Sequence, residues 1–518
     1  MTSSTDRRPA RKWSIVALSV AGAAAVVVSY IFSLTLALAC LALPVVLVKA
    51  LVSFNSSSLF IAEILLSLFG LVAGLTILWS LIPRRDKFEP TGILVDAARE
   101  KRLMAEIEFV AGSLREAMPR QVYLIPEPNA FVAQRGGFLG FGSRRILGLG
   151  LPLLATLSVS ELRALLAHEF AHFYSGDTRL GPWLYGARLS MVRVAQNLGE
   201  DSPVRHLTRF GVVAVAYTLL MAGIRLYWEV FMRLSQLISR QQEYRSDEIA
   251  CYVAGSQPFA EVLRKLPKTE AGLQSFWQSI VQPLVASGYQ PRIVEDFAAF
   301  QATPGNEGIA LASLQARLQI TSPKPFDSHP PLSARIARVE SLGIAAPQAN
   351  DQPAYSLFEN LATWESDLLR KLVPDLKNVQ LKSMSWETAA TEIYLPAWRK
   401  HIERFLPMFS GKTVASLPEF ATYLGPIADK ILNPPGRILN RTQREDQAMN
   451  ILAFALIASL VDRGWTLQMQ PGSCYLQRDS AVLHPDNVLA ALRSKSMSAN
   501  DWQTFCTNAG IGDCPLGR

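Results

Sequence analysis

The chain has 518 residues, of which 49% are hydrophobic and 18% charged, with a formal net charge of +8. This composition is too apolar for a purely soluble enzyme and too polar for a polytopic transporter, so it predicts a soluble body attached to a few membrane helices. The positive charge suits anionic lipid headgroups, and no nucleic-acid-binding motif occurs, so we expect no nucleic-acid partner. The five cysteines are scattered without CxxC spacing, which favours free thiols.

Two apolar runs near the N-terminus predict a membrane hairpin. The run from Trp13 to Val48 has no charged residue, and the run 58–82 carries only Glu63. We expect the first to form a tilted span that continues as a short helix broken near Pro44. The flanks of the two runs are basic, with Arg7, Arg8, Arg11 and Lys12 on one side and Arg84, Arg85 and Lys87 on the other. The positive-inside rule then places both ends of the hairpin, and all that follows, in the cytoplasm.

The segment LLAHEFAHFYSGD, residues 165–177, holds two histidines four positions apart with a glutamate between them. On a helix, His168 and His172 face the same way one turn apart, and two imidazoles so placed can bind one zinc ion. Glu169 is then close enough to act as a general base on a water molecule at that ion. The spacing therefore predicts two metal ligands and a catalytic base.

The residues before the motif predict where its helix begins. Ser158 followed by Glu161 has the spacing of a capping box, and neither Gly nor Pro follows before Gly176. The alternative is an ordinary helix that happens to carry two histidines. A third ligand on another element is needed to decide between the two interpretations.

The third ligand is best sought in SRQQEYRSDEIAC, residues 239–251, where Glu243 and Asp247 lie one helical turn apart. Glu243 can complete the ligand set and leave a fourth position for water. Asp247 can accept a hydrogen bond from the second nitrogen of a ligand histidine and fix its tautomer. The alternative is an ordinary charged helix face. Asp177 is either a further supporting group or merely the loop residue after Gly176.

Four motifs occur in a fixed order, namely NAFV at 129–132, LLAHEFAHFYSGD, RQQEYRSDEIA and SHPPLSARI at 328–336. In these motifs the chain resembles the HtpX-type family of membrane zinc metalloproteases, relatives of the CAAX prenyl-protein endopeptidases, over about residues 90–340. The resemblance implies a single zinc ion held by His168, His172 and Glu243, with Glu169 as the catalytic base.

The same resemblance implies that Asn129, Ala130 and Phe131 belong to an edge strand beside the cleft, where an extended substrate chain can add its own strand. In such relatives the HPP region closes the active site. His329 is therefore either a hydrogen-bond donor to the transition-state oxyanion or a turn residue before two prolines. Arg335 either pairs with a carboxylate near the site or lies on a solvated helix, and we favour the solvated helix.

The segment before Glu243 departs from the family, whose members often carry two clear membrane spans there. In this chain 182–198 is interrupted by two arginines, which favours an amphipathic segment, and 211–224 offers only about 14 apolar residues, short for a crossing. No proline interrupts 210–254. We therefore predict one long helix that touches the membrane at one end and presents Glu243 at the other, and a third span is not favoured.

The rest of the chain shows no motif that indicates a chemistry. Residues 285–327 have a mixed pattern and are expected to form loops around the cleft. The segment 343–356 is a linker by composition. Residues 357–518 are predicted to form a separate α-rich body, with a hairpin that turns at Pro471–Gly472.

The sequence thus predicts a mainly α (α+β) protein with a membrane anchor in 1–83, a zincin-like protease domain with a small edge-stranded sheet in 84–342, a linker, and an extra domain in 357–518. The expected function is that of a multi-pass, zinc-dependent endopeptidase of the cell's inner membrane that cleaves membrane or misfolded proteins at the cytoplasmic face. The alternatives are a non-cleaving membrane scaffold or regulatory protein that keeps the protease fold, and a prenyl-protein processing protease. The sequence predicts no oligomeric state.

Overall fold

The computed structural model describes residues 13–51, 57–82, 90–136, 142–174, 177–199, 202–209, 211–324, 327–433 and 438–517. The chain divides into two compact units, of which unit 1 consists of Met1–Glu270 and Leu311–Leu372, and unit 2 of Ala271–Ala310 and Val373–Arg518. This division differs from the boundaries drawn from the sequence, since 271–310 lies in unit 2. The functional domains drawn from the sequence stay a prediction.

Unit 1 is mainly helical with one small sheet, which confirms the predicted fold class. Its elements are α1 (Trp13–Leu51), α2 (Ser57–Leu81), β1 (Ile93–Leu94), α3 (Lys101–Ser113), β2 (Gln121–Ile125), β3 (Ala130–Arg135), β4 (Arg144–Gly150), α4 (Leu151–Thr156), α5 (Val159–Tyr174), α6 (Asp177–Asn197), α7 (Pro203–His206), η1 (Leu207–Arg209), α8 (Gly211–Ala254), α9 (Ser256–Phe276), α12 (Pro304–Leu318), α13 (Leu332–Leu342), η3 (Ala354–Leu357) and α14 (Leu361–Leu372). The division between the units falls within α9 and α12.

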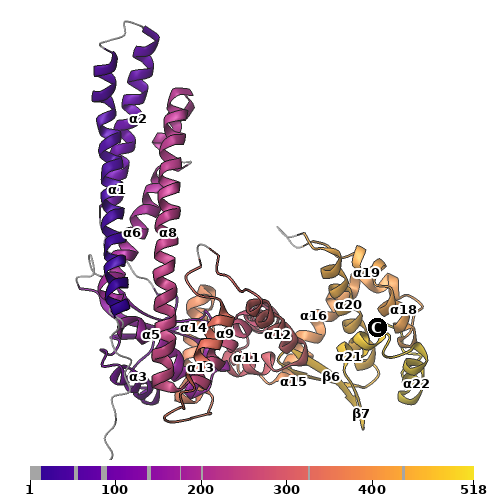
Figure 1. Ribbon diagram of the computed structural model, residues 1–518. Coiled ribbons are helices and arrows are strands. Elements are labelled where there is room, and N and C mark those ends of the chain that lie inside the picture. The colour runs from indigo at the N-terminus through magenta and orange to yellow at the C-terminus, as the bar shows by residue number, and fades with distance from the viewer. Residues whose placement is uncertain are drawn as a thin grey trace, which may run out of the picture. The chain divides into compact units, whose positions relative to one another are not determined.

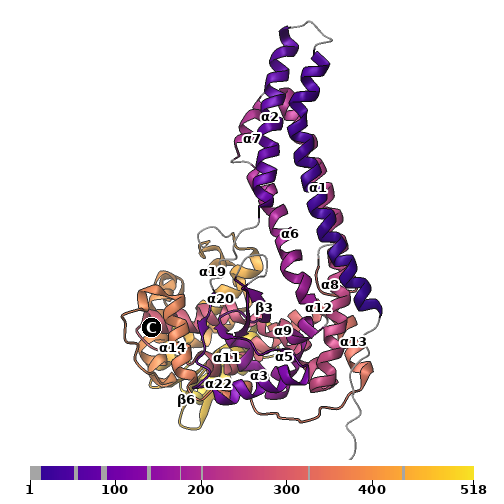
Figure 2. The ribbon, with the colours of Figure 1, turned by 90° about the vertical axis from the view of Figure 1, so that its left-hand side faces the viewer.

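The helices α1, α2, α6 and α8 lie side by side and project away from the rest of unit 1 (Figures 1 and 2). The expected break near Pro44 is wrong, because α1 is continuous through this proline. A proline inside an apolar helix loses one backbone hydrogen bond, which neighbouring helices and small local adjustments accommodate. Gly70 lets α2 approach α1 closely, because a Cβ at this position would lie 2.5 Å from the carbonyl oxygen of Cys40.

Among the described residues, three helices are long and apolar enough to cross a bilayer, namely Val20–Lys49, Phe60–Leu81 and Gly211–Ala254. The third lies in α8, which confirms the predicted long helix that carries Glu243. Its exposed apolar side chains continue to Leu237, well beyond the stretch counted in the sequence. Length and composition therefore allow α8 to cross the bilayer as well. The flanks on which the orientation was predicted, 1–12 and 83–89, lie outside the described residues.

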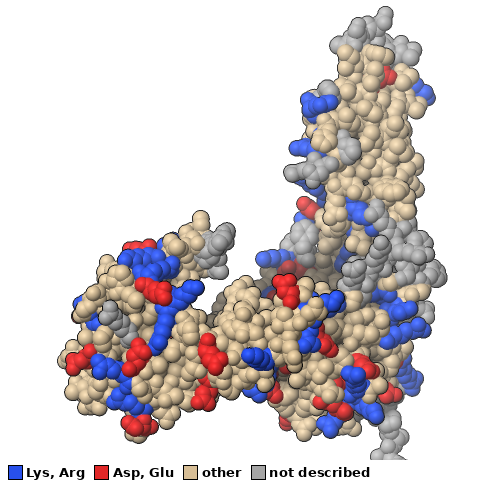
Figure 3. Space-filling model, turned by 180° about the vertical axis from the view of Figure 1, so that it is seen from behind, with Lys and Arg blue, Asp and Glu red and all other residues tan. Residues whose placement is uncertain are grey.

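Charged side chains are sparse on the visible face of these long helices and scattered in both signs over the remaining surface (Figure 3). A helix surface with exposed aliphatic side chains and few charges is suited to contact with lipid. The distribution agrees with a membrane protein that carries a larger body outside the bilayer.

The four-stranded sheet has the order β1-β2-β4-β3. β2 and β4 are parallel, while β3 runs antiparallel to β4 with Ala130 opposite Leu149. β3 is therefore an edge strand of the described sheet, and it packs against α5. The sequence placed Ala130 and Phe131 in an edge strand, which is where they lie, and Asn129 directly precedes that strand. Their role toward a substrate stays a prediction.

The segment expected to be a linker, 343–356, is hydrogen-bonded to the start of α5. The Val159 amide donates to the Gln352 carbonyl at 2.8 Å, and the Ala354 amide donates to the Leu157 carbonyl at 2.8 Å. The chain therefore returns to the first turn of the HExxH helix after α13 ends.

Glu100 attaches the next segment, 357–372, to the same unit. Its side chain is fully buried and accepts hydrogen bonds from the Glu359 amide at 2.7 Å, the Asn360 amide at 3.2 Å and Trp364 Nε1 at 2.6 Å. α14 also packs against β1 and β2. A buried carboxylate needs hydrogen-bond donors, and these three donors all come from 359–364, so Glu100 fixes the position of that segment.

Replacing Glu100 with alanine is expected to lower the free energy of unfolding of unit 1 by about 2–4 kcal/mol, because buried donors lose their only strong acceptor. Hydrogen–deuterium exchange should show faster exchange at the Glu359 and Asn360 amides. The control Glu108→Ala changes an exposed glutamate of α3 and should shift stability by less than about 0.5 kcal/mol. Unchanged exchange at both amides would rule out the proposed attachment.

Unit 2 is also helical, with a three-stranded sheet of order β5-β6-β7. Its elements are η2 (Trp277–Val281), α10 (Gln282–Ala286), α11 (Ile293–Gln301), η4 (Pro374–Leu376), α15 (Trp386–Ala389), η5 (Ala390–Tyr394), α16 (Leu395–Ile402), η6 (Glu403–Phe405), α17 (Leu406–Phe409), η7 (Val414–Ser416), α18 (Leu417–Thr422), α19 (Gly425–Asp429), α20 (Arg441–Val461), β5 (Thr466–Gln470), β6 (Ser473–Arg478), β7 (Ala481–Leu483), α21 (Pro485–Arg493) and α22 (Ala499–Ala509).

Of two sequence predictions, the hairpin at Pro471–Gly472 is confirmed and the loops over 285–327 are not. β5 and β6 pair antiparallel about Pro471–Gly472, where Gly472 has a φ of +79°, so the predicted hairpin is confirmed. The expectation of loops over 285–327 is wrong, since α11 and α12 occupy most of that range. The mixed composition gave no clear helical pattern, although two short helices form there and each buries one face.

Candidate metal centre

The HExxH motif lies on α5, and the predicted capping box forms at its start. The Ser158 amide donates to Glu161 Oε2 at 2.7 Å, and the Glu161 amide donates to Ser158 Oγ at 3.3 Å. These two bonds satisfy helix-terminal donors and fix where α5 begins. His168 and His172 follow on one face of the helix.

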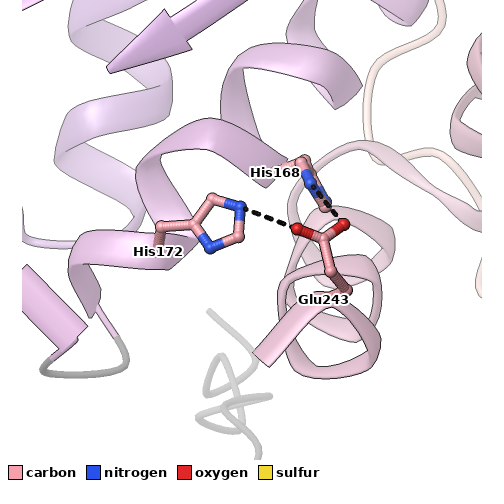
Figure 4. A group of neighbouring side chains, drawn as sticks. All are labelled: His168, His172 and Glu243. Atoms are coloured by element: carbon pink, nitrogen blue, oxygen red, sulfur yellow. Dashed lines mark ion pairs between the residues drawn. The ribbon is translucent and has the colours of Figure 1, made fainter. Parts of the chain in front are cut away.

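α8 packs against α5 and brings Glu243 to the two histidines (Figure 4). Glu243 Oε2 lies 3.7 Å from His168 Nε2, and Glu243 Oε1 lies 3.7 Å from His172 Nε2. One ligand atom of each of the three residues lies within 4.8 Å of the others. Tetrahedral zinc with bonds of about 2.1 Å places its ligand atoms about 3.4 Å apart, so small side-chain movements suffice to bind an ion.

The outer nitrogens of both histidines lie beside polar side chains, and both Nε2 atoms lie near Glu243. His168 Nδ1 lies 3.1 Å from Asp247 Oδ1, as the predicted role of Asp247 requires. His172 Nδ1 lies 3.3 Å from Ser246 Oγ. Partners of this kind orient a metal-binding imidazole and select the tautomer whose other nitrogen is free to bind.

Burial and neighbouring charges shift the pKa values of the α5 side chains, and for His172 and Glu169 the shift is in the direction that a catalytic metal site needs. Burial, reinforced by the adjacent His168, lowers the pKa of His172 to about 4, so this imidazole is neutral at pH 7. Burial alone would lower the pKa of His168, but the Asp247 carboxylate outweighs it and raises that pKa. Burial also raises the pKa of Glu169 to about 7, with the Glu243 carboxylate adding to the effect. A carboxylate with a pKa near 7 is well suited to proton transfer.

The position of Arg335 differs from the sequence-based expectation, which favoured a solvated helix. Its side chain is buried, and its guanidinium contacts Asp247 through Nη2 at 2.6 Å and Nε at 2.9 Å. Nη1 also lies 3.3 Å from Glu243 Oε2. Arg335 therefore neutralises the two buried carboxylates of α8, Glu243 and Asp247, and the paired geometry holds Asp247 in place beside His168.

The structure supports the predicted roles of His329 and Asp177 less than those of the residues above. His329 Nδ1 lies 2.9 Å from Glu243 Oε2, and 64% of its side chain is exposed. It is therefore at the site, while its role as an oxyanion donor stays a prediction. Asp177 is the first residue of α6, and its side chain lies outside the described residues.

The metal cluster borders a cavity of about 690 Å³, whose wall includes His168, Glu169 and His329. Asn129 and Ala130, at the start of the edge strand β3, line the same cavity. A peptide in this cavity could therefore lie along the edge strand and pass over the candidate metal position.

Sequence reasoning missed two further residues of the site. Ser246 lies directly before Asp247, and a helical reading of α8 gave no sign that it faces His172. Phe259 stacks on His168, with ring centroids 5.3 Å apart and planes 22° apart. Only the packing of α9 against α5 reveals this contact, because no local pattern links the two residues.

Two histidines and one glutamate from two packed helices, beside an edge strand and a cavity, form a group that could hold a metal ion, with donors of the kind found in catalytic zinc sites. Residues 97–342 match the model of Peptidase family M48. The resemblance drawn from the four motifs is confirmed. With its apolar helices, the chain is a membrane metalloprotease that acts on peptide or protein substrates.

Two similar proteins bear the name Protease HtpX or Protease HtpX homolog. A Protease HtpX homolog of Syntrophobacter fumaroxidans is 27% identical over 264 residues, 48% of this chain and 77% of that protein. Protease HtpX of Stenotrophomonas maltophilia is 28% identical over 254 residues, 48% of this chain and 74% of that protein. The crystal structure of S. mikatae Ste24p covers 61% of this chain and 67% of that chain, at 14% identity and a TM-score of 0.26.

Proposed function

We propose that the chain is a zinc-dependent endopeptidase that cleaves peptide bonds of membrane or misfolded proteins at the cytoplasmic face of the inner membrane. The observation that carries this proposal is the convergence of His168, His172 and Glu243, with ligand atoms within 4.8 Å of one another. Two imidazoles and one carboxylate are the ligand set of many catalytic zinc sites, which keep a fourth position for reactants.

Each residue of the candidate site has a separate role in the proposed peptide-bond hydrolysis. Zinc at the three ligands would supply Lewis-acid activation of the scissile carbonyl and of the attacking water. Glu169 takes a proton from that water and returns it to the leaving amine. Asp247 orients His168, and His329 donates a hydrogen bond to the oxyanion that forms on the substrate carbonyl. The edge strand β3 holds the substrate extended by adding it to the sheet.

The position of the site on α8 supports a substrate at the membrane surface. Exposed aliphatic side chains form a stripe along this helix, at Val212, Val215, Leu219, Leu226, Val230, Leu234 and Leu237. Leu237 precedes Glu243 by six residues, which is roughly 9 Å along a helix. We infer that α8 crosses the bilayer and that the ligand lies just beyond its cytoplasmic surface, within reach of polypeptide emerging from the membrane.

Metal analysis with a cleavage assay tests the proposal. The purified full chain in detergent should contain about one zinc ion, cleave unfolded casein, lose that activity to a chelator, and regain it with added zinc. His168→Ala should lack both the metal and the activity. A protein that binds zinc without cleaving any substrate would instead be the non-cleaving scaffold, and chelator-resistant cleavage would exclude the metal mechanism.

A further inference from the structure

The connection between α6 and α8 lies beside a candidate membrane span. It consists of the residues described between Asn197 and Gly211, which include α7 and η1. α7 packs against α2 (Figure 2), and Val204 of α7 is buried in one apolar cluster with Phe69 of α2. Since α2 contains the candidate span Phe60–Leu81, the connection lies within the thickness that α2 would cross.

The contacts of α8 give the depth of this connection. Ile224 of α8 and Ile77 of α2 line the same small cavity, so they lie at one level. Both helices run toward the body of unit 1 (Figures 1 and 2), and each rises about 1.5 Å per residue. Tyr217 and Gly70, each seven positions earlier on its helix, are therefore also level with each other. Gly70 is at the middle of Phe60–Leu81, so Tyr217 lies at the mid-depth of that span.

A cation lies at this depth. The Arg205 guanidinium carbon is 5.3 Å from the centroid of the Tyr217 ring, and the Tyr217 hydroxyl donates to the Leu198 carbonyl at 2.9 Å. Arg205 and its neighbour His206 are both exposed. A cation that faces hydrocarbon loses its hydration, and the face of one aromatic ring replaces only a small part of it. Arg205 therefore needs water or an anion around it.

The backbone of the connection has the same requirement. α6 ends at Asn197, and α7 and η1 are single short turns of four and three residues, so the chain is not one continuous helix here. In a bilayer, irregular backbone is tolerated only where protein buries it or water reaches it. Arg205, His206 and Arg209 are exposed, so the described part of unit 1 leaves one side of the connection uncovered. Water must therefore reach that side.

We propose that the connection between α6 and α8 thins the bilayer locally, with phosphate groups of phospholipids drawn inward to Arg205. A guanidinium group binds phosphate through paired, charge-assisted hydrogen bonds, and its long side chain can extend toward the membrane surface. The indentation starts from the leaflet farther from the body of unit 1, because the connection lies at the end of α8 that points away from that body (Figures 1 and 2). Elsewhere α1 and α2 keep the lipid at full thickness, since exposed apolar side chains reach Val48 and Phe60.

Labelling of introduced cysteines tests this thinning. His206→Cys places a thiol beside Arg205 and keeps the cation. Leu71→Cys is the matched control, because Leu71 is 45% exposed and follows Gly70 at the mid-depth of α2. The full-length variants, in vesicles of phosphatidylcholine and phosphatidylglycerol, are treated on both sides of the membrane with an impermeant maleimide and mapped by mass spectrometry. Position 206 should react at least about tenfold faster than position 71, because the reactive thiolate forms only where water is present.

A second substitution tests the role of the cation. Arg205→Leu, added to His206→Cys, should slow labelling at position 206 at least about fivefold, because an apolar side chain lets the bilayer recover its thickness. Arg205→Lys keeps the charge and should leave the labelling fast. Each variant should elute in size-exclusion chromatography as the wild type does.

Equal protection of positions 206 and 71 would overturn the proposal and would mean that a partner helix covers Arg205. Fast labelling at both positions would contradict it as well, since α2 would then lie outside the hydrocarbon. Unchanged labelling in Arg205→Leu would show that Arg205 does not draw in the headgroups. None of these measurements uses peptide cleavage, so a failure of the proposed protease function would leave their results unaffected.

Discussion

Replacing Glu169 with glutamine is expected to lower kcat by about 10²- to 10⁴-fold, the usual contribution of general acid–base catalysis. Glu169 lines the cavity beside the candidate ligand His168 but is not one of the three clustered ligands. Burial raises its pKa to about 7, so near neutral pH the side chain can both accept and return a proton. Glutamine keeps the size of the side chain but cannot accept the proton. The measurement is kcat on unfolded casein, alongside the metal content per chain.

The metal content should be the same in Glu169→Gln and the wild type, which separates loss of a base from loss of the site. Glu261→Gln is a suitable control, because Glu261 lies on α9, pairs with Arg264 at 2.9 Å and does not line the cavity. Its activity should stay within about twofold of the wild type, as for most substitutions away from a site. A Glu169→Gln protein that cleaves normally would show that another group is the base. A variant that loses its metal would show that Glu169 supports the ligands instead.

The sequence predicts most of the candidate metal centre, because its geometry is set by regular helices. His168 and His172 share a turn, and Glu243 and Asp247 share another, so each pair has a fixed relation before any tertiary contact forms. The sequence also predicts that one helix runs from the membrane segment to Glu243, since nothing in 210–254 interrupts it. These inferences need only helical periodicity, which is the most dependable signal in a sequence.

The features that the sequence did not predict depend on contacts between distant segments. Arg335 follows Asp247 by 88 positions, and its own helix shows nothing that separates a buried arginine from a solvated one. The segment 343–356 has the composition of a linker, yet its backbone bonds to the start of α5. Backbone hydrogen bonds of this kind carry no side-chain pattern, so composition alone cannot indicate them. Phe259 belongs to the same group, because its contact with His168 depends on how α9 packs.

Replacing Arg335 with methionine is expected to lower the free energy of unfolding of the metal-free protein by about 3–5 kcal/mol. Arg335 is buried and supplies the positive charge opposite two buried carboxylates, those of Asp247 and Glu243. Methionine fills similar space but leaves both carboxylates without that charge, and removing one partner of a buried ion pair costs more than the pair itself contributes. Denaturant unfolding of the chelator-treated protein in detergent measures the loss.

Arg338 provides the matched control, because it lies on the same helix, pairs with Glu248 and has a side chain that is 49% exposed. Arg338→Met should cost no more than about 1 kcal/mol, as solvent screens an exposed pair. Arg335→Lys should fall between the two, since lysine keeps the charge but cannot form the paired contact with Asp247. Equal losses from Arg335→Met and Arg338→Met would mean that water reaches both arginines alike. In that case Asp247 would owe its position beside His168 to the packing of α8, and the solvated placement first favoured for Arg335 would be energetically correct.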